Sequence, residues 1–182
     1  MTDSINTYIG FHATDIKYAK LIIENEFLVK PNDMQWLGQG IYFYLDKELA
    51  KWWTTRPSRR FGCNIKNAAI IEAKIQCSKD TCFDMRDVKV YRIAEKLFTE
   101  YFGEIYDNLD IDTPIGIDKL KCSFFDWLKA RYLINVIIGV FSDNEKAYLE
   151  STNLSIIHMT FGEVQLCVTD NTCIIEKKLS TI

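Results

Sequence analysis

Histidine is scarce in this chain, and the surroundings of the two histidines differ. His158 lies between Ile157 and Met159 in a strand-like run, which favours a structural role. His12 follows a short strand expected over 8–11 and precedes a helix start, so we expect it at a sheet edge beside a helix N-terminus. Anionic groups are stabilised at such a position. Taken alone, the pattern around His12 still favours a structural histidine.

Two glycines and two aromatic residues carry a stronger signal for a binding site. Gly38 and Gly40 let the backbone approach a ligand closely, although an ordinary turn explains a G-x-G pair equally well. Tyr42 and Trp53 follow, one in an expected strand and one in the helix after it. Two facing rings form a slot for a flat heterocycle, and a positively charged ring gains cation–π attraction. Two aromatic residues in the core are the alternative.

Other common site patterns do not occur in the sequence. The six cysteines include no C-x-x-C pair, and with two histidines they make no four-ligand zinc pattern, so we expect no metal. They are typical of buried small side chains in a reducing compartment. Neither a Walker phosphate loop nor a Rossmann G-x-G-x-x-G is present.

Length and composition predict one domain over residues 1–182, with 48% apolar and 26% charged residues. The net charge of −3 creates no global field that attracts nucleic acid or anionic lipid. The N-terminus lacks a basic region followed by an apolar run. The longest apolar run, 133–141, is about half of the roughly 20 residues that span a bilayer. We therefore expect a cytoplasmic protein without a membrane partner.

The first half of the chain predicts alternating strands and helices. Apolar residues at helical spacing indicate a helix over 16–26, capped by Thr14 or Asp15. The β-branched and aromatic run 41–44 indicates a strand, and Asp46 opens a helix to about residue 54.

The second half continues this alternation. Residues 136–141 fit either a buried strand or a continuation of the helix before them, and Asp170-Asn171 is the turn between the last strands. The three prolines, at 31, 57 and 114, lie in expected loops. The total is an α+β domain with helices inserted between antiparallel strands. Its other expected elements are a strand over 68–77, helices over 92–106 and 122–134, and short strands over 156–158, 164–169 and 173–176.

Three blocks of the sequence, in the right order, resemble the ADP-ribosyltransferases of the diphtheria-toxin and poly(ADP-ribose) polymerase type. Residues 10–14 read GFHAT, against His-Gly-Ser/Thr on that family's first strand. Residues 36–43 read WLGQGIYF, against Gly-x-Gly-Ile-Tyr-Phe, and Trp53 stands where the polymerases have a tyrosine. Residues 165–174 read QLCVTDNTCI, in phase with the late strand Glu-Tyr-x-Val-Tyr-Asp-x-x-Gln-Val. The resemblance implies a mostly antiparallel split sheet. The helical region at about 80–150 matches no part of the family pattern, so we expect it to be an insert.

The resemblance also implies NAD⁺ as co-substrate and a role for each matched residue. His12 would hydrogen-bond a ribose hydroxyl, assisted by Thr14, and the backbone of Ala13 would hold the nicotinamide carboxamide. Tyr42 and Trp53 would sandwich the cationic nicotinamide ring, which is then displaced through an oxocarbenium-like state. The implied cofactor-binding residues are His12, Ala13, Thr14, Gly40, Tyr42 and Trp53.

Two departures from the family pattern bear on the chemistry. Ala13 replaces a glycine, which requires a negative φ and a methyl group that points away from the ligand. Gln165 stands where elongating polymerases have a glutamate, and an amide cannot take a proton, so chain extension is not expected. Glu163 lies on the same face of the expected strand and could supply the charge, or could be a solvent-exposed rim carboxylate. The implied catalytic residues are His12, Tyr42, Gln165 and Glu163.

The acceptor of the ADP-ribose is expected to be a macromolecule, either RNA/DNA or protein. Basic residues alternate with aromatic ones after the second helix, a pattern that fits single-stranded nucleic acid, the pyrophosphate of NAD⁺ or a plain solvated surface. By analogy, small transferases of this kind act as toxins or anti-phage effectors, with an antitoxin protein as a further partner. The residues concerned are Lys51, Trp52, Trp53, Arg56, Arg59, Arg60, Phe61 and Lys66.

Two other functions compete with a mono-ADP-ribosyltransferase. The glutamine at 165 favours a degenerate module that binds NAD⁺, ADP-ribose or a partner without turnover. An RNA 2′-phosphotransferase of the related fold needs further basic and histidine residues that the sequence does not place.

Overall fold

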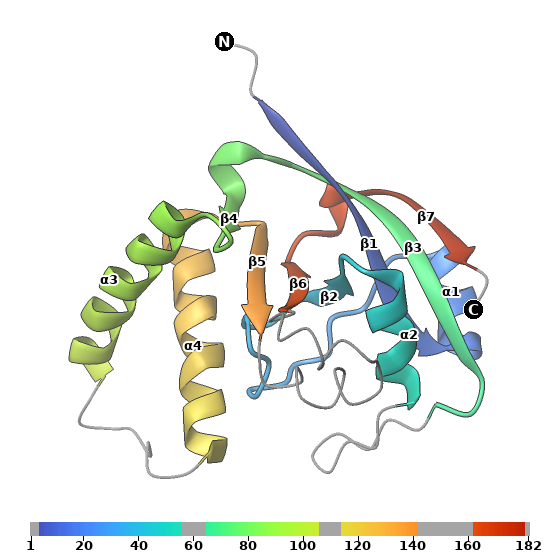
Figure 1. Cartoon of the computed structure of the whole chain (residues 1–182), viewed down its shortest axis with the longest axis horizontal. Coiled ribbons are helices and arrows are strands. Elements are labelled where there is room, and N and C mark those ends of the chain that lie inside the picture. The colour runs from blue at the N-terminus through green and yellow to red at the C-terminus, as the bar shows by residue number, and fades with distance from the viewer. Residues whose placement is uncertain (1–3, 56–64, 106–113, 142–161, 181–182) are drawn as a thin grey trace, which may run out of the picture.

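Seven strands form one sheet, in the order β4-β5-β6-β2-β1-β3-β7 (Figure 1). The computed structural model describes residues 4–55, 65–105, 114–141 and 162–180. The strands are β1 (Ile5–Asp15), β2 (Ile41–Tyr44), β3 (Ala68–Ser78), β4 (Cys82–Asp84), β5 (Val136–Phe141), β6 (Glu163–Val168) and β7 (Ile174–Ser180). The helices of these ranges are α1 (Ile16–Glu24), α2 (Lys47–Thr55), α3 (Val88–Ile105) and α4 (Pro114–Tyr132).

The sheet is mostly antiparallel, and its two halves share little strand pairing. Only β4 and β5 pair in parallel among the described strands. In one half β1 pairs with β3 over its full length, and in the other half β6 lies between β2 and β5. The halves are joined by a single register pair, Phe11 with Tyr44. The expected α+β class is therefore confirmed, and the sheet is divided between β1 and β2.

Helices α1 and α2 cover opposite faces of the half that contains β1 and β3. Because side chains alternate along a strand, Ile71 and Ile75 of β3 face α1 and pack with Ala19. Ile70 faces the other way and packs with Leu49 of α2. Trp53 of α2 therefore lies over the face opposite α1.

Short polar side chains begin both of these helices, as the sequence predicts. The Asp15 carboxylate accepts the Lys17 N–H at 3.0 Å, so Asp15 rather than Thr14 is the cap. The Asp46 carboxylate accepts the N–H groups of Glu48 and Leu49 at 2.7 and 3.1 Å. Each bond satisfies a backbone donor that has no partner inside the helix.

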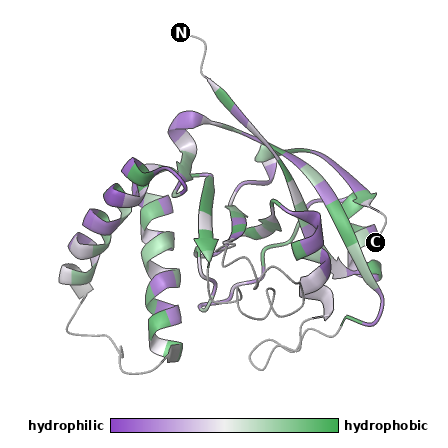
Figure 2. Cartoon of the chain, viewed as in Figure 1, coloured by the Kyte–Doolittle hydropathy of each residue, from purple (hydrophilic) through white to green (hydrophobic). Residues whose placement is uncertain are grey.

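The region expected as a helical insert also contributes to the sheet. It supplies β4 and β5, and Figure 2 shows β5 as hydrophobic along most of its length, as a strand buried on both faces requires. Helices α3 and α4 stand together at this end of the sheet (Figure 1) and pack through a cluster around Tyr101, Phe124 and Trp127. Among the four described helices, none combines the length and the hydropathy needed to cross a bilayer.

Helix α4 begins at Pro114 rather than at Cys122. A proline is tolerated in the first turn because its missing N–H needs no partner there. The helical period is hidden because Ile115 and Ile117 are both exposed. At the other end, Leu133 adopts a positive φ of 54° just before β5 starts, which settles residues 136–141 as a strand.

The turn at Asp170 does not join a hairpin. The Asp170 carboxylate accepts the Thr172 N–H at 2.9 Å and starts a single 3₁₀ turn. However, β6 pairs with β2 and β5, whereas β7 pairs with β3, so the chain crosses from one half of the sheet to the other. The strand expected over 156–158, with His158, lies outside the described residues.

Candidate functional site

A pocket of about 240 Å³ lies where the two halves of the sheet meet. Residues of β1, β2, β6 and α2 line it, together with the loop that precedes β2. Its volume is below the about 300–1,000 Å³ of pockets that enclose a drug-sized ligand, so it can enclose only part of such a molecule. The lining residues are His12, Ala13, Asn32, Met34, Gln35, Trp36, Tyr42, Tyr44, Trp53, Glu163 and Gln165.

His12 lies inside β1, an interior strand, and not at a sheet edge as expected. Its Nδ1 is 2.8 Å from the backbone oxygen of Tyr42. Because a carbonyl only accepts, Nδ1 carries the hydrogen and Nε2 is the acceptor atom. Burial lowers the pKa of His12 below its ordinary value of 6.5, so the ring is neutral at pH 7. The rings of Phe27 and Phe43 pack edge-on against it, at centroid distances of 5.2 and 5.8 Å.

The hydroxyl of Tyr42 is already engaged by the loop before β2. It accepts the Leu37 N–H at 2.7 Å and donates to the Gly38 carbonyl at 2.8 Å. Burial raises the pKa of Tyr42 well above its ordinary value, so the phenol stays protonated. Tyr42 therefore offers its ring to a ligand rather than its hydroxyl. Trp53, on α2, lines the same pocket as the sequence predicts.

Glu163 and Gln165 project from the same face of β6 into this pocket. The Gln165 amide nitrogen donates to a carboxylate oxygen of Glu163. Glu163 is only 4% exposed, so it is not the rim carboxylate that the sequence left open. Among the described residues that line the pocket, only Glu163 carries a formal charge. A positively charged ring or a developing positive charge is stabilised next to such a carboxylate.

Ala13 meets the backbone condition that its sequence position required. Among the described non-glycine residues only Leu133 has a positive φ, so Ala13 does not. Its side chain is buried in a cluster with Leu49, Ala50 and Ile70, beneath α2. Packing therefore accommodates the methyl group at this position.

Thr14 and Gly40 do not line the pocket. Thr14 shares a face of β1 with His12 but lies further along the strand. A Cβ on Gly40 would lie 2.4 Å from Sγ of Cys167 and 2.9 Å from the Val168 carbonyl oxygen. The close approach that requires glycine here is therefore to β6, and the cofactor-binding role expected for Gly40 stays a prediction.

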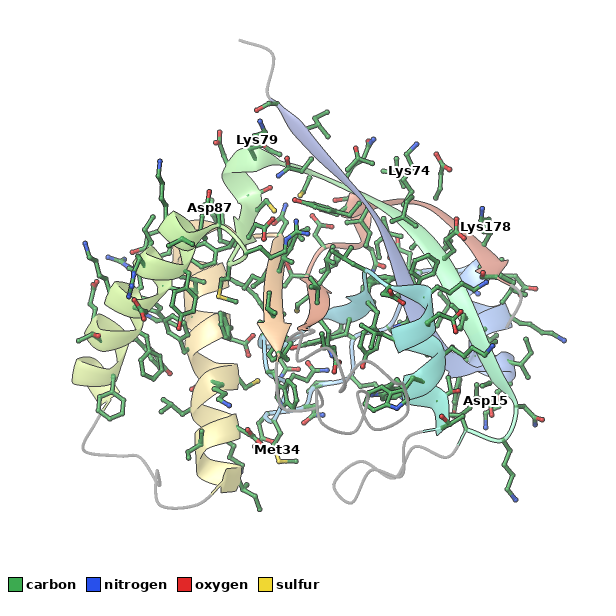
Figure 3. All side chains as sticks on the ribbon, viewed as in Figure 1. Asp15, Met34, Lys74, Lys79, Asp87 and Lys178 are labelled. Atoms are coloured by element: carbon green, nitrogen blue, oxygen red, sulfur yellow. The ribbon has the colours of Figure 1, made fainter. Side chains whose placement is uncertain are left out.

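The sequence reasoning missed the wall formed by the loop before β2. Asn32, Met34, Gln35 and Trp36 all line the pocket, and Trp36 rests on Phe141 with ring centroids 4.7 Å apart. Figure 3 labels Met34 on this loop. A tryptophan next to the G-x-G turn was the available signal. Tyr44 was also missed, although it follows Tyr42 by two residues and so shares its face of β2.

The basic segment after α2 is described only in part. Lys51 and Lys66 are exposed, and Trp52 is half-buried, whereas Arg56, Arg59, Arg60 and Phe61 lie outside the described residues. Within the described ranges, no three His, Cys, Asp or Glu side chains come together as metal ligands.

Comparisons with known proteins give one relative and no family. The chain is 32% identical over 112 residues to an uncharacterized protein of Methanocaldococcus jannaschii, a match that covers 61% of this chain. The chain spans about half the length of that relative, 48%. No family model matches the chain. No solved structure matches it either.

Proposed function

We propose that this chain is a mono-ADP-ribosyltransferase that transfers ADP-ribose from NAD⁺ to a macromolecular acceptor and releases nicotinamide. One observation carries the proposal. His12, Tyr42, Trp53 and Glu163 belong to four different elements and line one pocket. A neutral hydrogen-bond acceptor, two aromatic rings and a buried carboxylate are the groups that a cationic nicotinamide riboside requires.

In this proposal the pocket holds the nicotinamide end of NAD⁺. The ring lies between Tyr42 and Trp53, and the backbone of Ala13 holds the carboxamide. Nε2 of His12 accepts a hydrogen bond from a ribose hydroxyl, because Nδ1 already donates to the Tyr42 carbonyl. The adenosine half extends beyond this small pocket.

The reaction breaks the bond between the ribose anomeric carbon and the nicotinamide nitrogen. The bonding electrons leave with nicotinamide, which becomes neutral, and positive charge develops on the ribose. Glu163 stabilises this charge, while the hydrogen bond from Gln165 orients the carboxylate. The acceptor's nucleophile then bonds to the anomeric carbon, and its proton passes to Glu163 or to water.

The acceptor is RNA, DNA or protein, and the proposed setting is the cytoplasm, as a toxin or anti-phage effector restrained by an antitoxin. Transfer of label from adenine-labelled NAD⁺ into a whole-cell lysate tests the activity. We expect label with the wild type and with Gln76→Ala, which alters a β3 side chain outside the pocket, and no label with His12→Ala. Digestion by protease or by nuclease then names the acceptor class.

A non-catalytic module that binds NAD⁺ or ADP-ribose is the second candidate, and the glutamine at position 165 favours it. Saturable NAD⁺ binding without label transfer would support this module over the enzyme. If the chain neither transfers label nor binds NAD⁺, both candidate functions are overturned.

A further inference from the structure

The Gln39 side chain holds the pocket wall that comes from the loop before β2, together with Cys122 of α4, whose sulfur lies 3.5 Å from the Asn32 carbonyl oxygen. The Gln39 amide oxygen accepts the Asn32 N–H at 2.9 Å, and the amide nitrogen donates to the Asn32 carbonyl at 2.8 Å. A primary amide thus pairs with both polar groups of one peptide residue, as a neighbouring strand would. Asn32 in turn accepts the Met34 N–H through its side chain at 3.0 Å. Both Asn32 and Met34 line the pocket.

The backbone of Gln39 is held from the other side by α4. Its N–H donates to the Asp126 carboxylate at 2.7 Å. Its carbonyl accepts from the Lys129 ammonium at 2.6 Å, and the same ammonium is 3.2 Å from Asp126. The Lys129 side chain is only 8% exposed. A cation so buried is stable only with such partners, and removing one of them exposes the full cost of its desolvation.

The backbone next to Gln39 has the conformation that these contacts need. Gly38 has φ = +75°, and a Cβ there would lie 2.4 Å from Asp126 Oδ1 and 2.7 Å from Lys129 Nζ. The positive φ and the absent side chain let α4 reach the peptide groups of the loop. The Tyr42 hydroxyl bonds to Leu37 and Gly38 in the same segment. The loop is therefore fixed to α4 on one side and to a pocket ring on the other.

From this network we infer that Gln39, held by Asp126 and Lys129, is a positioning residue for the pocket: it transmits the fixed position of α4 to the wall formed by Asn32, Met34 and Trp36. The inference rests on the proposed function for its kinetic part only. The wall contacts the bound substrate both before and during the reaction. Loosening the wall therefore weakens the binding of the substrate and of the transition state equally. Such a loss raises KM and leaves kcat unchanged.

Fluorine NMR of protein labelled with 5-fluorotryptophan tests the position of the wall directly. The resonance of Trp36 is assigned with Trp36→Phe, and that of Trp127, on α4, serves as an internal reference. In Gln39→Met, which keeps the length but loses both bonds to Asn32, we expect the Trp36 resonance to shift or broaden and the Trp127 resonance to stay. The Gln76 amide hydrogen-bonds only to Thr7 among the described residues. In Gln76→Met we therefore expect no change in the Trp36 resonance or in the Trp127 resonance.

Steady-state kinetics with NAD⁺ supply the second test. We expect KM to rise about tenfold in Gln39→Met, with kcat within about twofold of wild type. Gln39→Glu is isosteric and keeps the hydrogen bond from the Asn32 N–H, but its carboxylate cannot donate to the Asn32 carbonyl. We therefore expect the KM of Gln39→Glu to lie between that of wild type and that of Gln39→Met. If Gln39→Met does not fold, Gln39→Glu still tests whether Gln39 positions the wall.

Two results would overturn the inference. One is an unchanged Trp36 resonance in both Gln39 variants, and the other is a fall in kcat at constant KM. If the wild type neither binds nor uses NAD⁺, the proposed function fails, whereas the response of the Trp36 resonance still decides whether Gln39 positions the wall.

Discussion

Nδ1 of His12 lies 2.8 Å from the backbone carbonyl oxygen of Tyr42, so a side chain of β1 donates to the backbone of β2 close to the single register pair that joins the two halves of the sheet. The same bond fixes the tautomer of His12 and leaves Nε2 as an acceptor. One contact thus supports both the fold and the proposed binding of ribose.

Stability should depend on pH through His12. Burial lowers its pKa in the folded state below the ordinary 6.5, so the unfolded chain takes up a proton first as the pH falls. The free energy of unfolding is therefore unaffected by this group above about pH 7 and decreases below about pH 6.5. Urea denaturation of wild type and His12→Gln between about pH 7.5 and 5 measures the effect. If the free energy of unfolding changes equally with pH in the two proteins, His12 contributes nothing to the pH dependence of stability.

The buried carboxylate on β6 should carry more of the chemistry than the amide beside it. Because Glu163 can bear charge and accept a proton, we expect Glu163→Gln to lower kcat by about 10²- to 10⁴-fold with little change in the KM for NAD⁺. Gln165→Ala removes only a hydrogen bond to that carboxylate and should cost about tenfold or less. Initial rates of nicotinamide release measure the loss of activity in both variants. The reverse order of effects would assign the role to Gln165.

Alanine at position 40 should destabilise the fold rather than weaken binding directly. Its Cβ would lie 2.4 Å from Cys167 Sγ and 2.9 Å from a backbone oxygen, so β2 and β6 must move apart, at a cost of about 1–3 kcal/mol. Gly103→Ala is the control: Gly103 is exposed on α3 with no atom within 4 Å of a built Cβ. Alanine there should stabilise by up to about 1 kcal/mol. Chemical denaturation compares them, and equal stabilities would contradict the packing argument.

Cys82 should be the most reactive of the described cysteines at neutral pH. A hydrogen bond from Cys77 lowers the pKa of Cys82 to about 7, and the Tyr8 hydroxyl lies 3.5 Å from its sulfur. Burial, by contrast, raises the pKa of Cys167 to about 11. Since the thiolate is the nucleophile, alkylation of Cys82 should reach half its maximal rate near pH 7. Peptide mapping after a timed iodoacetamide pulse follows each site, and Cys77→Ser should move the Cys82 midpoint upward.

Local patterns predicted most elements and three of the pocket residues, His12, Tyr42 and Trp53, whereas Ala13, Glu163 and Gln165 were implied by the resemblance to ADP-ribosyltransferases. The strand at 41–44, the strand from Ala68 and the helices begun by Asp15 and Asp46 follow from periodicity and capping, which depend on residues close in the chain. Helix α4 was placed too late because Ile115 and Ile117 face solvent, so its first turns lack an apolar stripe. Strand pairing at the C-terminal end depends on distant partners, and no local rule sends β6 and β7 to opposite halves of the sheet.

The sequence by itself shows the candidate chemical groups: a histidine before a helix cap and two aromatic residues after a G-x-G turn. The resemblance adds a carboxylate two residues before a glutamine. Tertiary structure alone decides that they meet, because β1, β2, β6 and α2 converge only where the sheet divides. It also decides the role of the glycines, since Gly40 packs on Cys167 and Gly38 admits Asp126 and Lys129. Packing and hydrogen bonding between segments some ninety residues apart hold the loop and α4 together, and such contacts have no signature in local sequence.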